Sequence, residues 1–238
     1  MTGQARVLRG VQVPGRAATW RAAGFDVTRT GVTGSGATRT GVTGPHILLD
    51  EVVIGLGEPG WWFDPPVDAE VDGLAPLVGT APLVGTAPLV GTAPAGRSAH
   101  PNGVSGIDHL VVTTPDVERT TAALAGIGLT PRRTIDGLRG EPLRLRFFLL
   151  GPAVLELVGP TGAPTGEAAE QAAQQPARIS GVALVAPDLA ALAEVATGPP
   201  RAAVQPGRQI ITLRGEEFGV PVAVLTPRVR RAEHGPSR

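Results

Sequence analysis

Short apolar runs separated by glycine- or proline-containing turns organise the chain from residue 106 onward. Residues 106–114 (GIDHLVVTT) predict a β-strand, and Pro115–Asp116 predicts the start of a helix with Asp116 as its N-cap. That helix is expected to end near Gly128. Three further strands are then predicted, at 130–136, 143–150 and 153–158. Together these elements make one βαβββ unit.

The same pattern returns after a polar, Ala- and Gln-rich connector at 161–177. Residues 179–186 (ISGVALVA) predict a strand, and Pro187–Asp188 predicts the start of a second helix. Strands are expected to follow at 201–205, 208–214 and 220–225. Each unit alone would expose one apolar sheet face, and pairing two units buries those faces. We therefore expect an α+β fold in which paired βαβββ modules form curved sheets around a cleft.

Two tandem repeats interrupt the first half of the chain. TRTGVTG occurs at 28–34 and 38–44, and APLVGT occurs three times in succession over 75–92. A proline in every sixth position removes a backbone donor each time and excludes a helix or a central strand. This predicts a Pro/Gly-rich linker. Four segments result, namely an N-terminal region at 1–74, the linker at 75–104, the main domain at 105–228 and a flexible tail at 229–238.

The 238 residues carry 21 basic and 21 acidic side chains, so the formal net charge is zero. This balance argues against a protein held on nucleic acid or anionic lipid by bulk charge. Cysteine is absent, which excludes disulfides, thiolate metal sites and a catalytic thiol. No apolar run approaches the roughly 20 residues that span a bilayer, and the first residues lack the apolar core of a signal peptide. We expect a soluble, cytoplasmic protein with no nucleic-acid or membrane partner.

Alternation along the predicted strands places candidate functional side chains on common faces. His109, Val111 and Thr113 point to one side of the first strand, and Glu156 points to one side of the fourth. An imidazole and a carboxylate aimed into one concave sheet are suitable ligands for a divalent metal. Val111 and Thr113, on the face of His109, are expected to contact a small-molecule substrate. Without a metal, burial in an apolar cleft would raise the pKa of Glu156 and suit it to act as a general base.

Both candidate residues also have purely structural interpretations. The imidazole of His109 could bond a backbone carbonyl or Asp108, and Glu156 could be a buried acid held by an arginine. Arg144 and Arg146 share one face of the predicted strand at 143–150 and are the candidates for that partner. The same two guanidinium groups could instead bind an anionic or polar substrate, or lie solvated on the surface.

Two segments, GIDHLVVTTPDVERTTAALAGIGL and FFLLGPAVLELVGP, resemble the vicinal oxygen chelate superfamily. This superfamily includes glyoxalases, extradiol dioxygenases and bleomycin-resistance proteins, and the resemblance spans 106–227. It implies that His109 and Glu156 are ligands of a divalent metal (Zn, Ni, Fe or Mn) that acts on the substrate as a Lewis acid. The second unit departs from the pattern. It has Gly181 and Ala223 at the positions aligned with His109 and Glu156, and neither residue can bind a metal.

The resemblance implies a glyoxalase-like enzyme that acts on a small oxygenated metabolite by lyase or isomerase chemistry. The alternative is a metal-free protein that binds and sequesters a small molecule, as bleomycin-resistance proteins do. A third interpretation is a degenerate scaffold whose cleft is only packed core. Members of the superfamily often pair units between chains, so the resemblance also implies a homodimer.

The N-terminal region shows a weaker version of the same order. VLRGVQVPG, RAATWRAAGF and ILLDEVVIGLG follow each other as strand, helix and strand, so we expect a degenerate third module there. The cluster Trp61-Trp62-Phe63 is expected to cap a core, with stacking on a ligand as the alternative. His46 and His100 lie beside proline or glycine, and His234 lies in a polar tail; all three are expected to be solvated.

Overall fold

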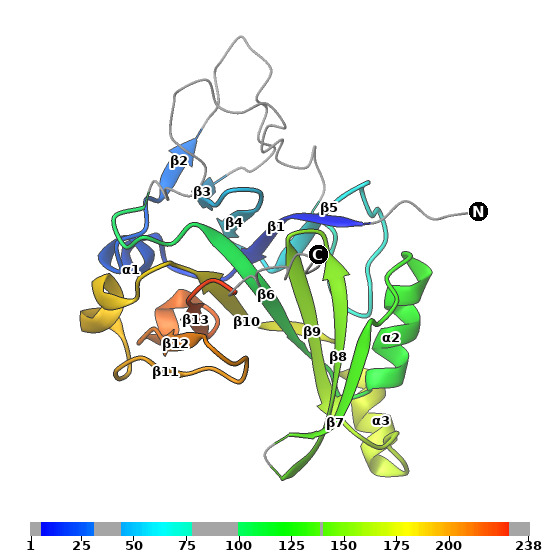
Figure 1. The fold of residues 1–238 in the computed structure, drawn as a ribbon. Coiled ribbons are helices and arrows are strands. Elements are labelled where there is room, and N and C mark those ends of the chain that lie inside the picture. Colours follow the sequence, from blue (N-terminus) through cyan, green and yellow to red (C-terminus); the bar gives the residue numbers. More distant parts are fainter. Residues whose placement is uncertain (1–5, 31–43, 78–99, 139, 229–238) are drawn as a thin grey trace, which may run out of the picture.

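The computed structural model describes residues 6–30, 44–77, 100–138 and 140–228, arranged as an eight-stranded and a five-stranded sheet (Figure 1). The strand order of the larger sheet is β11-β12-β13-β10-β6-β9-β8-β7. That of the smaller sheet is β2-β3-β4-β1-β5. In both sheets, strands that are far apart in the sequence lie side by side. Within the described residues, no helix is both long and apolar enough to cross a membrane.

The first predicted unit forms one half of the larger sheet. Its elements are β6 (Gly106–Thr113), α2 (Val117–Gly126), β7 (Arg133–Leu138), β8 (Glu141–Leu150) and β9 (Ala153–Pro160). The first and last strands, β6 and β9, pair in parallel, and β8 and β7 continue outward as antiparallel neighbours. Helix α2 begins after Asp116, whose carboxylate accepts hydrogen bonds from the backbone N–H groups of Glu118 and Arg119.

The second unit forms the other half of that sheet. Its elements are β10 (Arg178–Val185), the 3₁₀ helix η1 (Ala190–Val195), β11 (Arg201–Ala202), β12 (Gln209–Thr212) and β13 (Val222–Leu225). Here β10 pairs in parallel with β13 and antiparallel with β6, which joins the two units edge to edge. Helix α3 (Glu167–Gln174) lies in the connector between the units. The predicted α+β fold of paired βαβββ modules is confirmed.

Two elements of the second unit differ from the sequence pattern. The segment after Asp188 is a six-residue 3₁₀ helix rather than an α-helix. It ends at Val195, and Thr197 then donates its backbone N–H to the carbonyl oxygen of Thr212 of β12. The strand expected at 201–205 comprises only Arg201–Ala202, since the backbone then turns and Ala203 bonds back to Arg208.

The N-terminal region repeats the same topology. Its elements are β1 (Val7–Val13), α1 (Ala17–Ala22), β2 (Thr28–Thr30), β3 (Gly44–Leu48) and β4 (Val53–Leu56). Strands β1 and β4 pair in parallel, as β6 and β9 do, so the expected third module is present. An additional strand, β5 (Gly60–Asp64), pairs antiparallel with β1. It therefore occupies the edge at which β10 joins β6 in the larger sheet.

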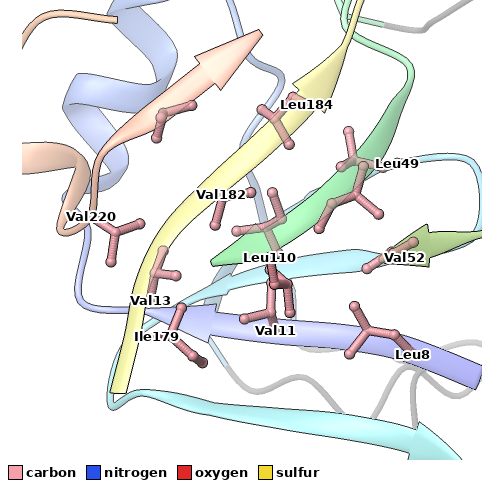
Figure 2. Packing of buried hydrophobic residues seen from close by; sticks show 14 of the residues in the cluster. Leu8, Val11, Val13, Leu49, Val52, Leu110, Ile179, Val182, Leu184 and Val220 are labelled. Atoms are coloured by element: carbon pink, nitrogen blue, oxygen red, sulfur yellow. The ribbon is translucent and has the colours of Figure 1, made fainter. Parts of the chain in front are cut away.

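The smaller sheet packs against the central strands of the larger one. Figure 2 shows Val11 of β1 beside Leu110 of β6, with Leu8 of β1 and Val182 and Ile179 of β10 in the same cluster. All five side chains are buried, and Leu110 is fully inaccessible. Because side chains alternate along β6, the face that carries Leu110 is opposite the face that carries His109. The N-terminal module thus packs on the face of the sheet that carries Leu110, and not on the face that carries His109.

Two histidines expected to be solvated are buried, so that prediction is wrong for both. His46 is 2% exposed, and its Nδ1 lies 3.0 Å from the carbonyl oxygen of Gly44. His100 is 7% exposed, with Nε2 2.9 Å from the carbonyl oxygen of Leu48 and Nδ1 accepting from the backbone N–H of Asp26. Each ring bonds backbone groups, which satisfies its polar atoms inside the module.

The aromatic cluster belongs to the core of the smaller sheet. The rings of Trp61 and Phe63 meet edge to face with centroids 4.9 Å apart, and Trp62 packs with Val53 on the other side. The predicted linker at 75–104 lies outside the described residues except at its two ends. There Pro76 forms an isolated β-bridge with Trp61, and residues 100–104 pack on the N-terminal module. The predicted tail and His234 lie outside the described residues altogether.

Candidate active site

His109 and Glu156 meet on the open face of the larger sheet. In the β6–β9 ladder, Val111 is the register partner of Glu156 and His109 that of Val154, so the two side chains project to the same side. The Nε2 atom of His109 lies 3.9 Å from Oε2 of Glu156, and each side chain is 23% exposed. The buried residues of both strands, such as Leu110 and Leu155, point to the other side.

Behind this pair lies a buried carboxylate. Asp108 has no register partner on β10, because the β6–β10 ladder shifts by one residue between the pairings of His109 and Ile107. This irregularity brings Oδ2 of Asp108 to 2.8 Å from Nδ1 of His109. The Asp108 side chain is only 5% exposed. The structural interpretation of His109, in which its ring bonds Asp108, is therefore correct for one of its two nitrogen atoms.

An arginine of the second unit completes the cluster. Nη2 of Arg208 lies 2.8 Å from Oδ1 of Asp108, and the Arg208 side chain is 1% exposed. Its Nε donates to the carbonyl oxygen of Thr226 at 2.6 Å, and its Nη1 donates to Oε1 of Gln205 at 2.5 Å. Sequence reasoning missed Arg208, because nothing in the local pattern distinguishes a buried arginine at the start of a strand from an exposed one.

Burial and charge move the two carboxyl pKa values in opposite directions. Burial raises the pKa of Glu156 above its ordinary value; the facing charge of His109 lowers it, and that of Asp108 raises it further. Burial alone would also raise the pKa of Asp108. Hydrogen bonds and charges from His109 and Arg208 outweigh burial and hold that pKa well below its ordinary value. Asp108 is thus ionised at neutral pH, and Glu156 is the group suited to exchange a proton.

Arg144 and Arg146 do not join this pair, so the interpretation in which one of them holds Glu156 is wrong. Arg146 is the register partner of Leu157, which places both arginines on the opposite face of the sheet, toward α2. There Arg146 and Arg144 bind the carboxylate of Glu118 at 2.6 and 2.8 Å, and Arg144 also binds Asp136. The prediction failed because strand alternation shows which residues share a face but not which face is the open one.

Val111 and Thr113 lie where alternation placed them. Both are partly exposed on the face of His109, and Val111 is directly beside Glu156 in the ladder. On the other side of Glu156, its register partner on β8 is Phe147, also partly exposed, which the sequence analysis did not single out. Two apolar side chains, Val111 and Phe147, therefore flank the Glu156 carboxylate on the two neighbouring strands.

The donor set for a resident divalent metal is incomplete. His109 Nε2 and Glu156 are two ligands, whereas protein sites for such metals normally supply three or more. Asp108 is already engaged by His109 and Arg208. Gly181 pairs with Val111 and Ala223 with Ala183, so the second unit presents small apolar residues there. In the part of the chain that the structure describes, no three His, Asp or Glu side chains cluster as a metal site.

Comparison with known proteins finds likeness in structure alone. No family model matches the chain, and no curated protein matches its sequence. Methylmalonyl-CoA epimerase from Mycobacterium tuberculosis is 15% identical, with a TM-score of 0.40 over 54% of this chain and 91% of its own. The epimerase from Streptomyces coelicolor is 20% identical, with a TM-score of 0.39 over 53% and 96%. The hypothetical protein BH1468 from Bacillus halodurans C-125 is 13% identical, with a TM-score of 0.40 over 53% and 97%.

The topology of the chain itself agrees with the predicted family fold. Two βαβββ units, each closed by a parallel pairing of its first and last strands, join through β6 and β10. In this fold of paired βαβββ units, the candidate active site lies on the first unit, and the third module covers the back of the sheet.

Proposed function

We propose that the protein is an enzyme of the lyase or isomerase type that moves a proton on a small oxygenated metabolite. The observation that carries this proposal is the 3.9 Å approach of His109 Nε2 to Glu156 on a partly exposed face. Two groups that can each bind a proton, placed next to each other, are the arrangement that general acid–base catalysis requires.

The proposed step begins with the Glu156 carboxylate removing a proton from a carbon next to a carbonyl group. The electron pair of the broken C–H bond moves to the carbonyl oxygen and leaves an enolate. The Nε2 lone pair of His109 then accepts this proton from Glu156 and returns it to the enolate, so no atom or charge is lost. The raised pKa of Glu156 makes its carboxylate a stronger base than an ordinary glutamate. The step uses no metal, in keeping with the incomplete donor set.

The test is solvent exchange. The protein is incubated in D₂O with 2-oxobutyrate and with hydroxyacetone, and loss of the C–H signal next to the carbonyl is followed by ¹H NMR against buffer. We expect exchange above the buffer rate, with Glu156→Gln and His109→Asn each reducing it by about 10²-fold or more. Glu118→Gln is the matched control, because Glu118 lies on the α2 side of the sheet. A Glu156→Gln protein that exchanges at the wild-type rate would refute the proposal.

A metal-free binding protein is the second candidate. It is favoured by Gly181 and Ala223 of the second unit, which lie beside the pair and carry no side chain that could act as a base or a ligand. For this candidate, ligand binding would be measurable by calorimetry while solvent exchange stays at the buffer rate. Elemental analysis of the purified wild type and of His109→Ala shows whether a metal binds at His109. Equal contents of Zn, Ni, Fe and Mn, all far below one per chain, exclude the metal-assisted variant.

The homodimer implied by the family resemblance stays a prediction. Sedimentation equilibrium measures it directly. The edge of β1 is already taken by β5, so a dimer of this chain would use other surfaces than that edge.

A further inference from the structure

We propose that Arg208 of the second unit is a positioning residue that, through Asp108, holds His109 in one tautomer with its Nε2 lone pair facing Glu156. This inference builds on the site of the proposed function and assigns the second unit a role in it. The second unit supplies no ligand or base to the pair. It supplies a buried cation instead.

The place of the guanidinium is determined by the second unit alone. Its Nε and Nη1 donate to Thr226 and Gln205, which both belong to that unit, at 2.6 and 2.5 Å. The backbone around it is held as well, since Gln209 donates its N–H to Oγ1 of Thr226. With two of its nitrogen atoms bound in this way, Nη2 is left facing Oδ1 of Asp108 at 2.8 Å. A planar guanidinium held at three nitrogen atoms has little freedom to turn.

The contact with Arg208 determines which Asp108 oxygen atom is left to bind the imidazole. An ionised carboxylate only accepts hydrogen bonds. Oδ1 is occupied by Arg208, so Oδ2, 2.8 Å from Nδ1 of His109, requires that this nitrogen atom carry the hydrogen. In the neutral ring, Nε2 then has the lone pair, and it is the atom that lies 3.9 Å from Glu156. The tautomer that the proposed proton transfer needs is thereby selected from outside the first unit.

A purely structural ion pair is the competing explanation. Burying two charges is expensive, and a buried pair is often no more stabilising than apolar side chains of the same size. A pair kept only for stability would have no bearing on which nitrogen atom of His109 carries the hydrogen. The tautomer therefore separates the two explanations.

Arg228 provides an internal control. Its Nε lies 3.6 Å from the same Oδ1 atom of Asp108, but its side chain is 58% exposed. A screened, longer contact of this kind contributes little. Replacement of Arg228 therefore removes a cation near Asp108 without removing the buried anchor.

The experiment reads the tautomer by two-bond ¹H–¹⁵N correlation spectra of the histidine rings. The chain has four histidines, and His109→Asn identifies the signals of His109. In the wild type at neutral pH we expect the hydrogen on Nδ1. In Arg208→Gln we expect a mixture with the hydrogen on Nε2, and a solvent-exchange rate about tenfold or more lower, as for other partners that orient a functional histidine. Arg228→Gln should keep the wild-type tautomer and rate.

Should Arg208→Gln fail to fold, Arg208→Lys replaces it, since an ammonium keeps the charge but cannot reach the three partners in the same planar geometry. A folded Arg208 variant in which His109 stays in the wild-type tautomer would overturn the inference, as would a wild type with the hydrogen on Nε2. The outcome is independent of the proposed function. A wild type that exchanges no substrate protons, but whose tautomer changes in Arg208→Gln, would support this inference and refute that function.

Discussion

His109 and Glu156 face each other because Val111, two residues after His109, is the register partner of Glu156 in the parallel β6–β9 ladder. The pairing sets two side chains on one face and leaves Nε2 and Oε2 3.9 Å apart. At this distance the two atoms make no direct hydrogen bond. Nε2 and Oε2 therefore do not satisfy each other's hydrogen-bonding capacity. Because both side chains are partly exposed, a substrate group can reach them.

The first prediction concerns the cost of keeping Glu156 ionised. Its pKa is raised in the folded protein, so the stability it contributes is complete below the ordinary pKa of 4.5 and is lost as pH rises through the folded value. Glutamine stays uncharged at every pH, so the Glu156→Gln variant does not lose this stability as pH rises. We expect its free energy of unfolding in urea to exceed that of the wild type by about 0.5–2 kcal/mol at pH 8 and to match it near pH 4.

Glu118→Gln is the control for this prediction. The pKa of Glu118 is lowered, chiefly by its hydrogen bond from Arg146, so its replacement should give no gain in stability at pH 8. A Glu156→Gln protein that is less stable than the wild type at pH 8 would contradict the argument.

The second prediction concerns the acid stability that Asp108 provides. Its folded pKa is lowered, so its contribution is present above the ordinary value of 3.8 and is lost as pH falls through the folded value. Asp108→Asn leaves the buried Arg208 without a counter-charge and should cost about 3–5 kcal/mol at pH 7. In urea unfolding, the difference from the wild type should stay constant from pH 7 to 5 and narrow below pH 4. If the stability difference between Asp108→Asn and the wild type became larger in acid, the prediction would be wrong.

The third prediction concerns the contact between the two sheets. Leu110 is fully buried among side chains of β1 and β10 (Figure 2), so Leu110→Ala should lower the free energy of unfolding by about 2–5 kcal/mol. Leu149→Ala is the matched control, because Leu149 is 54% exposed, and its effect should stay below about 0.5 kcal/mol. Urea midpoints give both values. Equal effects would mean that the two sheets do not pack as described.

The fourth prediction concerns the start of α2. The Asp116 carboxylate accepts from the N–H groups of Glu118 and Arg119, at 3.0 Å each. Asp116→Ala should cost about 1 kcal/mol in thermal or urea unfolding, whereas Asp116→Asn, which can still cap, should cost only a fraction of this. If the asparagine variant loses as much as the alanine variant, charge rather than capping is the dominant effect.

The fifth prediction concerns the close approach of the second unit to the N-terminal module. Gly219 has φ +83°, and a Cβ atom there would lie 2.5 Å from the carbonyl carbon of Pro14. Gly103 has φ +77° but open space around it, so Gly103→Ala measures the cost of the backbone conformation alone, about 1 kcal/mol. Gly219→Ala should cost clearly more, because the neighbouring backbone must move. Similar urea midpoints for the two variants would contradict the close contact.

Much of the fold could be predicted because its signals are local. Alternation of apolar and polar residues placed β6 and β9 and showed which of their side chains share a face, and the Pro-Asp dipeptide placed the start of α2. The same reasoning failed where distant segments compete for the chain. The strand expected at 201–205 stops at Ala202, because Ala203 bonds back to Arg208 of the following segment. His46 and His100 are buried in the folded module, although the proline or glycine beside each predicts a solvated loop.

By itself the sequence determined the repeated βαβββ order and the face shared by His109, Val111 and Thr113, because strand periodicity depends only on neighbouring residues. Tertiary structure alone decided that Arg144 and Arg146 face α2 and that Arg208 comes from the second unit to Asp108. The physical reason is that an arginine is long and always charged, so its partner is whichever carboxylate the packed sheets bring within reach. A residue pattern records which side chains share a face, but only the assembled sheets determine what that face meets.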